Sequence, residues 1–142
     1  MSFDLALVEG DLKIQSGGTI KTVTHTSKIK QDVIKIILTA LGSNKYHPWY
    51  GCAVSDDIVG QNISDDIVFS DIQSSIIQGL ERLRTLQISQ MTSQSISLAE
   101  TIGSIGEVNV YRAIEDPRML IIDVTVYSRR LDKIEETFTV VP

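Results

Sequence analysis

Apolar and polar residues alternate along one stretch in the last third of the chain. The apolar residues of this stretch occupy every second position: Leu120, Ile122, Val124 and Val126. This spacing places them on one face and predicts a half-buried antiparallel strand over residues 119–127. Two further runs rich in β-branched residues, 108–112 and 134–141, flank it. Because the connections are only about six residues long, we expect a three-stranded antiparallel meander.

Earlier in the chain the apolar spacing changes to that of helices. In the first helical stretch the apolar residues share one face: Ile29, Val33, Ile36, Ile37 and Ala40. The pattern predicts a helix from Lys28 to about Leu41. Ser27 precedes it as a cap, and Gly42 follows it where a C-terminal glycine stop belongs.

A second apolar stripe predicts a longer helix. Its members recur at steps of three and four residues: Phe69, Ile72, Ile76, Leu80 and Leu83. We expect this helix to begin at Ser64 and to end near Met91, with two aspartates in the first turn, where the helix dipole favours anions. A capping-box pattern from Ser97 to Glu100 predicts a short third helix.

The first 24 residues combine apolar positions at short intervals with glycine turns, which predicts short strands or a small hairpin. The order of short strands, helices and meander predicts an α+β fold with the helices on one face of the sheet. A chain of 142 residues is the size of one domain, so we expect a single domain over residues 1–142.

Composition excludes several functional classes. The chain has 13 basic and 18 acidic residues, a net charge of −5, which argues against a nucleic-acid-binding module. Its single cysteine, Cys52, cannot form an intrachain disulfide. No apolar run approaches the roughly 18 residues of a membrane helix, and the acidic N-terminal stretch is not that of a signal peptide. We expect a protein made in the cytoplasm, with no nucleic-acid or membrane partner.

No motif predicts catalysis. Zinc sites need three or four ligands in short spacings, and neither His25 nor His47 lies in such a pattern with Cys52. The residues around Cys52 and the two histidines also match no pattern of a Cys-His nucleophile pair. The acidic residues form pairs adjacent in sequence, whereas a glycosidase needs carboxylates facing each other across a cleft. These pairs are Asp56-Asp57, Asp65-Asp66, Glu115-Asp116 and Glu135-Glu136. The glycines match no phosphate-binding fingerprint. We therefore expect no catalytic residue, no metal and no cofactor.

Two features suggest partner contacts. Trp49 and Tyr50, in the segment between the helices, either plug the end of the core or form a contact patch, since such residues anchor interfaces well. All six arginines follow residue 81, whereas residues 46–81 contain no Lys or Arg. This asymmetry is either a solvated surface or two complementary docking faces, acidic on the helical side and arginine-bearing on the sheet side.

The last strand of a meander has an edge that can pair with a strand of another chain. Charged residues near this edge either protect it or orient an incoming strand. We expect the contact to involve four residues in and before this strand: Arg129, Arg130, Phe138 and Val140.

The order of several short motifs resembles a known family. After a Gly-Asp near the start and a Gly-Gly turn, the motifs are Ile29-x-Gln31, Leu41-Gly42 and Pro48-x-Tyr50-Gly51. This set resembles the baseplate-wedge, sheath-initiator family of contractile phage tails, labelled lysozyme-like in older annotation, with a counterpart in type VI secretion baseplates. The resemblance spans most of the chain.

Members of that family carry Glu-Pro-Arg just before the sheet. Here the corresponding residues are Glu115, Asp116, Pro117 and Arg118, with Asp116 inserted between Glu and Pro. Either Glu115 or Asp116 takes the acidic position. Pro117 would set a turn, and Arg118 would offer a bidentate fork to a carboxylate or to carbonyl groups. The alternative is a plain hairpin turn with a solvated arginine.

The resemblance implies a structural protein of the virion tail baseplate and not an enzyme. It implies contacts with the sheath protein, with wedge proteins and with the tail tube, in multiple copies around a symmetric ring. Sheath assembly would begin by β-augmentation at the edge of the C-terminal sheet. The alternatives are a type VI secretion baseplate component, a small regulatory adaptor on the same fold and, less favoured, a cell-wall glycosidase.

Overall fold

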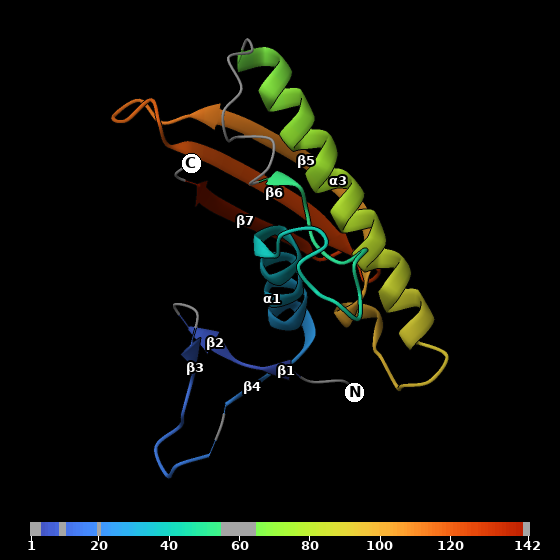
Figure 1. The fold of residues 1–142 in the computed structure, drawn as a ribbon. Coiled ribbons are helices and arrows are strands. Elements are labelled where there is room, and N and C mark those ends of the chain that lie inside the picture. Colours follow the sequence, from blue (N-terminus) through green and yellow to red (C-terminus); the bar gives the residue numbers. More distant parts are fainter. Residues whose placement is uncertain (1–3, 9–10, 20, 55–64, 141–142) are drawn as a thin grey trace.

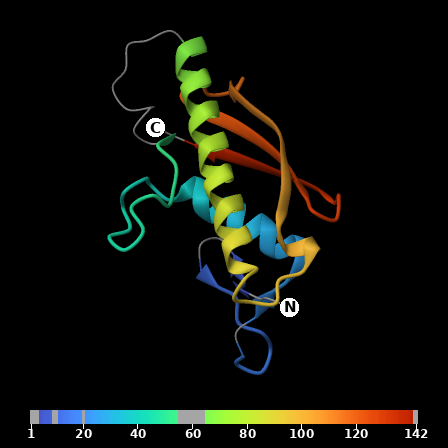
Figure 2. The same cartoon turned by 90° about the vertical axis from the view of Figure 1, so that its right-hand side faces the viewer.

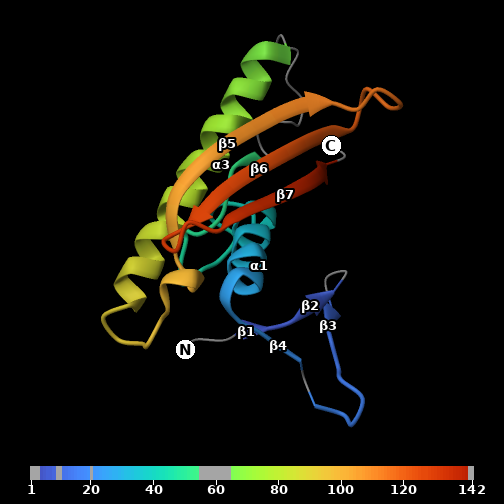
Figure 3. The same ribbon diagram turned by 180° about the vertical axis from the view of Figure 1, so that it is seen from behind.

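Two helices lie against one face of a three-stranded sheet, and a small β-arm projects from the start of the first helix (Figure 1). The computed structural model describes residues 4–8, 11–19, 21–54 and 65–140. The opposite face of the sheet carries none of the described helices (Figure 3). The predicted α+β class, with short N-terminal strands, two main helices, a short third helix and a C-terminal three-stranded meander, is confirmed.

The sheet consists of β5 (Ile102–Arg112), β6 (Leu120–Ser128) and β7 (Lys133–Val140), antiparallel and in that order. In the central strand Ile122 lies opposite Val110 on one side and Phe138 on the other. The alternate apolar positions of β6 face the helices and are buried, as the period of two predicts. The predicted final residue of the last strand, Val141, lies outside the described residues.

Strand β5 begins at Ile102, whereas the sequence predicts a start at Val108. The strand runs through two glycines, with register shifts beside each of them. A Cβ atom at Gly103 would lie 2.9 Å from the Ser128 carbonyl oxygen, and one at Gly106 would lie 2.9 Å from that of Thr125. Glycine therefore permits a close strand approach here, although glycine in sequence suggests a break.

Helix α1 spans His25–Leu38, with Thr24 as its N-cap. Both predicted ends are therefore displaced: Ser27 is not the cap, and the helix stops before Leu41. After the helix, Ala40 forms an isolated β-bridge with Cys52, and the backbone N–H of Cys52 donates to the Thr39 carbonyl at 2.9 Å. This pairing ends the helix three residues early and leaves the predicted stop, Gly42, in the turn that follows.

Helix α3 spans Asp65–Gln90, close to the predicted bounds; the predicted cap Ser64 lies outside the described residues. The predicted short helix is the 3-10 turn η1 (Leu98–Glu100). One half of its predicted capping box is present, since the Glu100 carboxylate accepts from the Ser97 backbone N–H at 2.8 Å, whereas the Ser97 hydroxyl makes no hydrogen bond with a described residue. Helix α3 packs closely on the segment before it, because a Cβ atom at Gly79 would lie 2.3 Å from the Cys52 Sγ.

The core lies between the two helices and the sheet. Its fully buried large apolar residues come from both layers: Ile29, Ile36, Ile72, Ile76, Leu80, Ile102, Leu120 and Ile122. Of the predicted helical stripes, Phe69 is only partly buried and Ala40 is exposed, because α1 ends before Ala40.

The β-arm stands apart from this core (Figure 2). It pairs β1 (Asp4–Leu5) with β4 (Thr22–Val23) and β2 (Leu7–Val8) with β3 (Asp11–Leu12). Among the described residues of the arm only Ala6 is buried. The side-chain amide of Gln31 on α1 hydrogen-bonds to backbone groups of the arm. It accepts from the Leu7 N–H at 2.9 Å and donates to the Leu5 carbonyl at 2.6 Å.

Candidate functional site

Strand β7 forms an outer edge of the sheet. Within the described part of the chain it pairs with β6 alone. In an antiparallel edge strand, backbone N–H and C=O groups of alternate residues point away from the sheet and are free to pair with another strand. The edge predicted from the sequence is therefore present, and its accessible groups belong to the backbone.

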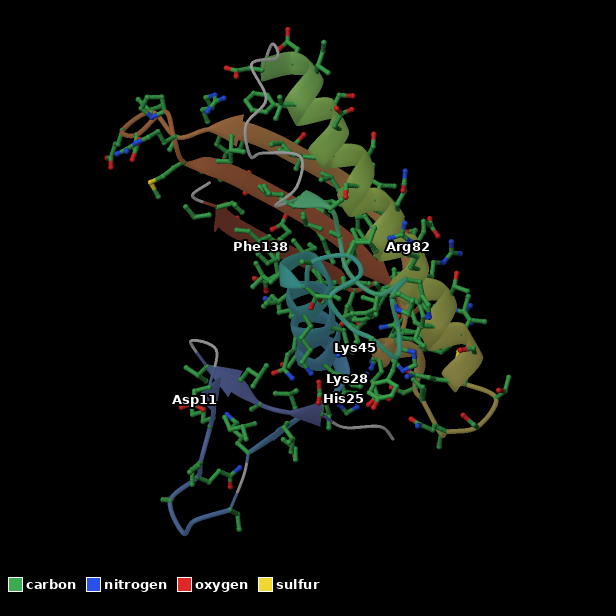
Figure 4. All side chains as sticks on the ribbon, viewed as in Figure 1. Asp11, His25, Lys28, Lys45, Arg82 and Phe138 are labelled. Carbon is green, nitrogen blue, oxygen red and sulfur yellow. The ribbon has the colours of Figure 1, made fainter. Side chains whose placement is uncertain are left out.

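The two β7 residues named as contacts face inward. Phe138 is 8% exposed and belongs to the core, and Val140 is partly buried against it. Figure 4 shows Phe138 on this strand. Only the backbone of Phe138 is placed to meet an incoming strand at the edge. The side chains on the outer face of β7 are those of Lys133, Glu135, Thr137 and Thr139.

The Glu-Asp-Pro-Arg stretch lies in the β5–β6 loop, beside the end of β7, because Leu120 pairs with Val140. The Asp116 carboxylate accepts from the Arg118 backbone N–H at 2.9 Å and so closes the turn. Glu115 is exposed and makes no hydrogen bond or ion pair with a described residue. The inserted Asp116 therefore has a local structural role, while the Glu115 carboxylate is free for a partner.

Arg112, which the sequence analysis did not select as a site residue, holds this loop on α3. Its guanidinium donates to both Asp65 carboxylate oxygens, at 3.0 and 2.6 Å, and to the Pro117 carbonyl at 2.6 Å. It also lies over the Phe69 ring, 5.7 Å from the centroid. Hydrogen bonds from Arg112 lower the pKa of the Asp65 carboxyl. No sequence signal marks this pair, because its members are 47 residues apart.

Arg129 and Arg130 lie at the opposite end of the sheet, in the turn from β6 to β7. Both side chains are exposed, and the backbone N–H of Arg129 donates to the Thr101 carbonyl at 3.0 Å. The turn is close to the start of β7, since Tyr127 pairs with Lys133. The predicted loop and turn residues therefore flank β7 at its two ends.

Trp49 and Tyr50 lie on the helical side, away from the β7 edge. The Trp49 ring is 42% exposed and makes edge contacts with His47 and Tyr50, at centroid distances of 5.5 and 6.2 Å. Beside it a cavity of about 460 Å³ is bounded by α3 residues that include Arg82 and Leu86. Tyr50 packs partly against the core. Tyr50 therefore belongs to the core and Trp49 to the exposed surface, and the contact patch stays a prediction.

Of the two interpretations of the charge asymmetry, that of an acidic helical side and an arginine-bearing sheet side is wrong. Arg82 and Arg84 lie on α3 and not on the sheet, and Figure 4 shows Arg82 on this helix. Arg112 of the sheet neutralises Asp65 of the helix within one molecule. The acidic and basic residues are therefore mixed across the two layers. Asp56 and Asp57, which contribute to the acidic stretch, lie outside the described residues.

The candidate chemical groups are poorly placed for catalysis. Burial raises the pKa of the Cys52 thiol to about 11, so it stays protonated at neutral pH and is a weak nucleophile. Glu135 pairs with Lys133, and Glu136 pairs with Lys30 of α1, so these two carboxylates face different ways. Within the described ranges no cluster of three His, Cys, Asp or Glu could hold a metal ion. Neither described helix combines the length and apolar character needed to cross a membrane.

Comparison with known proteins yields a likeness in fold. No family model and no curated protein matches the chain. The crystal structure of a "putative tail lysozyme" from Geobacter sulfurreducens superposes with a TM-score of 0.58 and 16% sequence identity. The match covers 80% of this chain and 86% of that one. The present chain therefore has the fold of that protein over most of its length.

Proposed function

We propose that this chain is a structural component of a contractile tail baseplate, which joins the wedge and initiates sheath assembly at the β7 edge. The main observation that supports this proposal is that β7 pairs with β6 alone among the described strands. The family resemblance in the motifs and the fold likeness to a protein named as a tail lysozyme both support a tail-associated role. The sheath protein, wedge proteins and tail tube are the proposed partners, and the virion tail is the proposed location, with copies in a ring.

The proposed mechanism is β-augmentation. A sheath strand would hydrogen-bond to the outward backbone groups of β7, and alternate side chains would set its register. Exposed Glu115 and Arg118 at one end of the edge, and Arg129 and Arg130 at the other, would contact the chain that leads into or out of the added strand. Trp49 would form a separate contact, with a wedge protein on the helical side.

A proline pair tests this mechanism. Deleting β7 would remove buried Ile134 and Phe138 and unfold the sheet, so single substitutions are needed. In an antiparallel edge, adjacent residues alternate between donating to the sheet and pointing the N–H outward. One of the two substitutions Glu135→Pro and Glu136→Pro therefore removes an N–H that points away from the sheet, and that variant should remain folded. The other removes a hydrogen bond to β6 and should be less stable. Thermal melting shows which variant is which.

Each variant is then co-expressed with the candidate sheath protein, and assemblies are imaged by electron microscopy. The folded proline variant should seed far fewer sheath rings than the wild type, although its melting temperature is close to normal. Glu135→Gln, which keeps every backbone donor, is the matched control and should seed normally. Full seeding by the folded proline variant would refute β-augmentation at β7. If the folded wild-type protein never seeds rings, the sheath-initiation role is refuted, and a wedge-only scaffold, a type VI component or an adaptor becomes the favoured function.

A cell-wall glycosidase is the second candidate, because the protein of similar fold is named a lysozyme. The acidic pairs of the present chain offer little support for such an enzyme. Asp65 is bound by Arg112, and Glu135 and Glu136 face different ways. Purified protein incubated with peptidoglycan should release no fragments, with a known lysozyme as positive control. Cleavage that is lost on neutralising one carboxylate would favour the enzyme over the structural role.

A further inference from the structure

Two cavities flank the exposed ring of Trp49 on the helical side of the molecule. The larger, of about 460 Å³, is bounded by Trp49 and by five α3 residues between 81 and 89. The smaller, of about 260 Å³, is bounded by Trp49, by His47 and by α3 residues 86 and 90, among others. Leu86 lines both cavities, so the ring stands between two hollows that follow α3. A chain segment laid along α3 would therefore meet the ring from either side.

The wall of the larger cavity presents an apolar surface. The Thr85 hydroxyl donates to the Glu81 carbonyl at 2.9 Å, and the Ser89 hydroxyl donates to the Leu86 carbonyl at 2.8 Å. Both hydroxyl protons are therefore used within α3. The Trp49 ring and the Leu86 side chain supply the rest of the wall, and such surfaces favour an aromatic or large apolar group.

Arg82 gives this cavity its charge. The cavity has two charged lining residues, Glu81 and Arg82. The Glu81 carboxylate pairs with Arg84, with 3.5 Å between Oε2 and Nη1, whereas Arg82 makes no ion pair with a described residue. These three side chains together leave one net positive charge beside the cavity. The charge therefore favours a partner group that carries a carboxylate.

The loop before α3 holds the Arg82 guanidinium in place. Its Nη1 donates to the Gly51 carbonyl at 3.3 Å, and its other N–H groups make no hydrogen bond with a described residue. Gly51 has a φ of +119°, and a Cβ atom there would lie 2.5 Å from the Thr39 carbonyl oxygen. Only glycine fits this turn, which places a carbonyl beside Arg82. The unused N–H groups remain available to a carboxylate.

We propose that the larger cavity binds an acidic segment of a partner protein, in which an aromatic residue lies next to Glu or Asp. The aromatic side chain would lie between Trp49 and Leu86, and the carboxylate would accept from the unused N–H groups of Arg82. A basic segment would be repelled by Arg82. This inference rests on the proposed contact of Trp49 with a wedge protein, and it adds the chemistry of the segment that makes the contact.

The test follows the fluorescence of the full chain, because Trp49 is its single tryptophan. The probe is the peptide acetyl-Glu-Phe-Glu-amide. The matched neutral peptide is acetyl-Gln-Phe-Gln-amide, and acetyl-Glu-Gly-Glu-amide keeps the charge but lacks the ring. We expect a saturable change of the Trp49 emission with the acidic aromatic peptide, and an affinity weaker by about fivefold or more for each of the other two. Equal affinities for the acidic and neutral peptides, or no saturable change with any of them, would overturn the proposal.

Variants locate the site. Arg82→Gln should lower the affinity for the acidic peptide to that for the neutral one. Arg118→Gln removes the same charge from a side chain that is 84% exposed in the β5–β6 loop, and this control should bind as the wild type does. Ser89→Lys adds a positive charge at an exposed lining position and should tighten binding by about twofold or more. Wild-type affinity in Ser89→Lys would refute the site even if Arg82→Gln folds poorly.

The result is separate from that of sheath seeding, because no residue of β7 lines either cavity. Peptide binding without ring seeding would keep this inference and refute sheath initiation, whereas ring seeding without peptide binding would do the reverse. A Trp49 emission that changes with the concentration of the chain alone would show that a second copy covers the cavity. That outcome would also overturn the proposal.

Discussion

At the scale of single residues, the position of the β5–β6 loop depends on Arg112. Its fork binds the Asp65 carboxylate and the Pro117 carbonyl at once, which joins the loop to the first turn of α3. A bidentate arginine–carboxylate pair fixes orientation as well as distance. The exposed Glu115 and Arg118 are therefore presented on a loop with a defined attachment.

We predict that Arg112→Lys keeps the charge but loses this attachment. Arg112 holds the pKa of the Asp65 carboxyl below its ordinary value, chiefly through hydrogen bonds, so the substitution should raise that pKa towards the ordinary value. Because the pKa is lowered in the folded state, the attachment is complete above about pH 4 and is lost as pH falls through the lowered value. An NMR pH titration of the Asp65 carboxyl measures the change.

The control is Arg118→Lys, because the Arg118 side chain is 84% exposed and binds Asp116, not Asp65. It should leave the Asp65 titration unchanged. An unaltered Asp65 pKa in Arg112→Lys would show that general charge, and not the fork, lowers it.

At the scale of elements, the β-arm differs from the rest of the fold in how it is held. Helices and sheet share a buried apolar core, whereas the arm is attached by polar contacts to Gln31 and by the ion pair of Asp4 with Lys35. Elements with few buried apolar contacts open at lower free energy than the global unfolding reaction. The arm should therefore open while the helices and sheet stay folded.

We predict that Gln31→Leu accelerates amide hydrogen exchange in residues 4–23 by about tenfold or more, because each lost hydrogen bond costs about 1 kcal/mol. Exchange in α3 should stay near the wild-type rate, and mass spectrometry of peptic peptides reports both regions. Gln73→Leu is the matched control, since Gln73 donates to the Val108 carbonyl at 2.7 Å and does not touch the arm. Unchanged arm exchange in Gln31→Leu would mean that other contacts hold the arm.

At the scale of the whole molecule, both layers share one core. Ile36 of α1, Ile76 of α3 and Ile122 of β6 are each fully buried and belong to the same cluster. A core shared in this way couples the unfolding of helices and sheet. The single domain over residues 1–142 remains a prediction that unfolding experiments can test.

We predict that Ile122→Ala lowers the free energy of unfolding by about 2–5 kcal/mol, because it leaves a cavity between the layers. Ile121→Ala, one residue away on the other face and only partly buried, should cost much less. Urea unfolding followed by circular dichroism and by Trp49 fluorescence measures both. The two signals should shift together, and separate transitions would contradict a single cooperative unit.

The sequence by itself determined the kinds of element, their order and most of their bounds. Apolar spacing reports which face of a helix or strand is buried, and caps such as Ser97 act within one turn. The same local information predicted the meander and hence the β7 edge. It did not show that the side chain of Phe138, named as a contact residue, belongs to the core.

The tertiary structure decided the features that depend on residues far apart in the chain. Pairing with Cys52 ended α1 early, and close strand packing drew Gly103 and Gly106 into β5. The pairing of Arg112 with Asp65 joins charges that one of the two interpretations of the sequence placed on separate faces. Local patterns report backbone preference and burial, whereas these contacts exist only after folding brings distant groups within hydrogen-bonding or van der Waals distance.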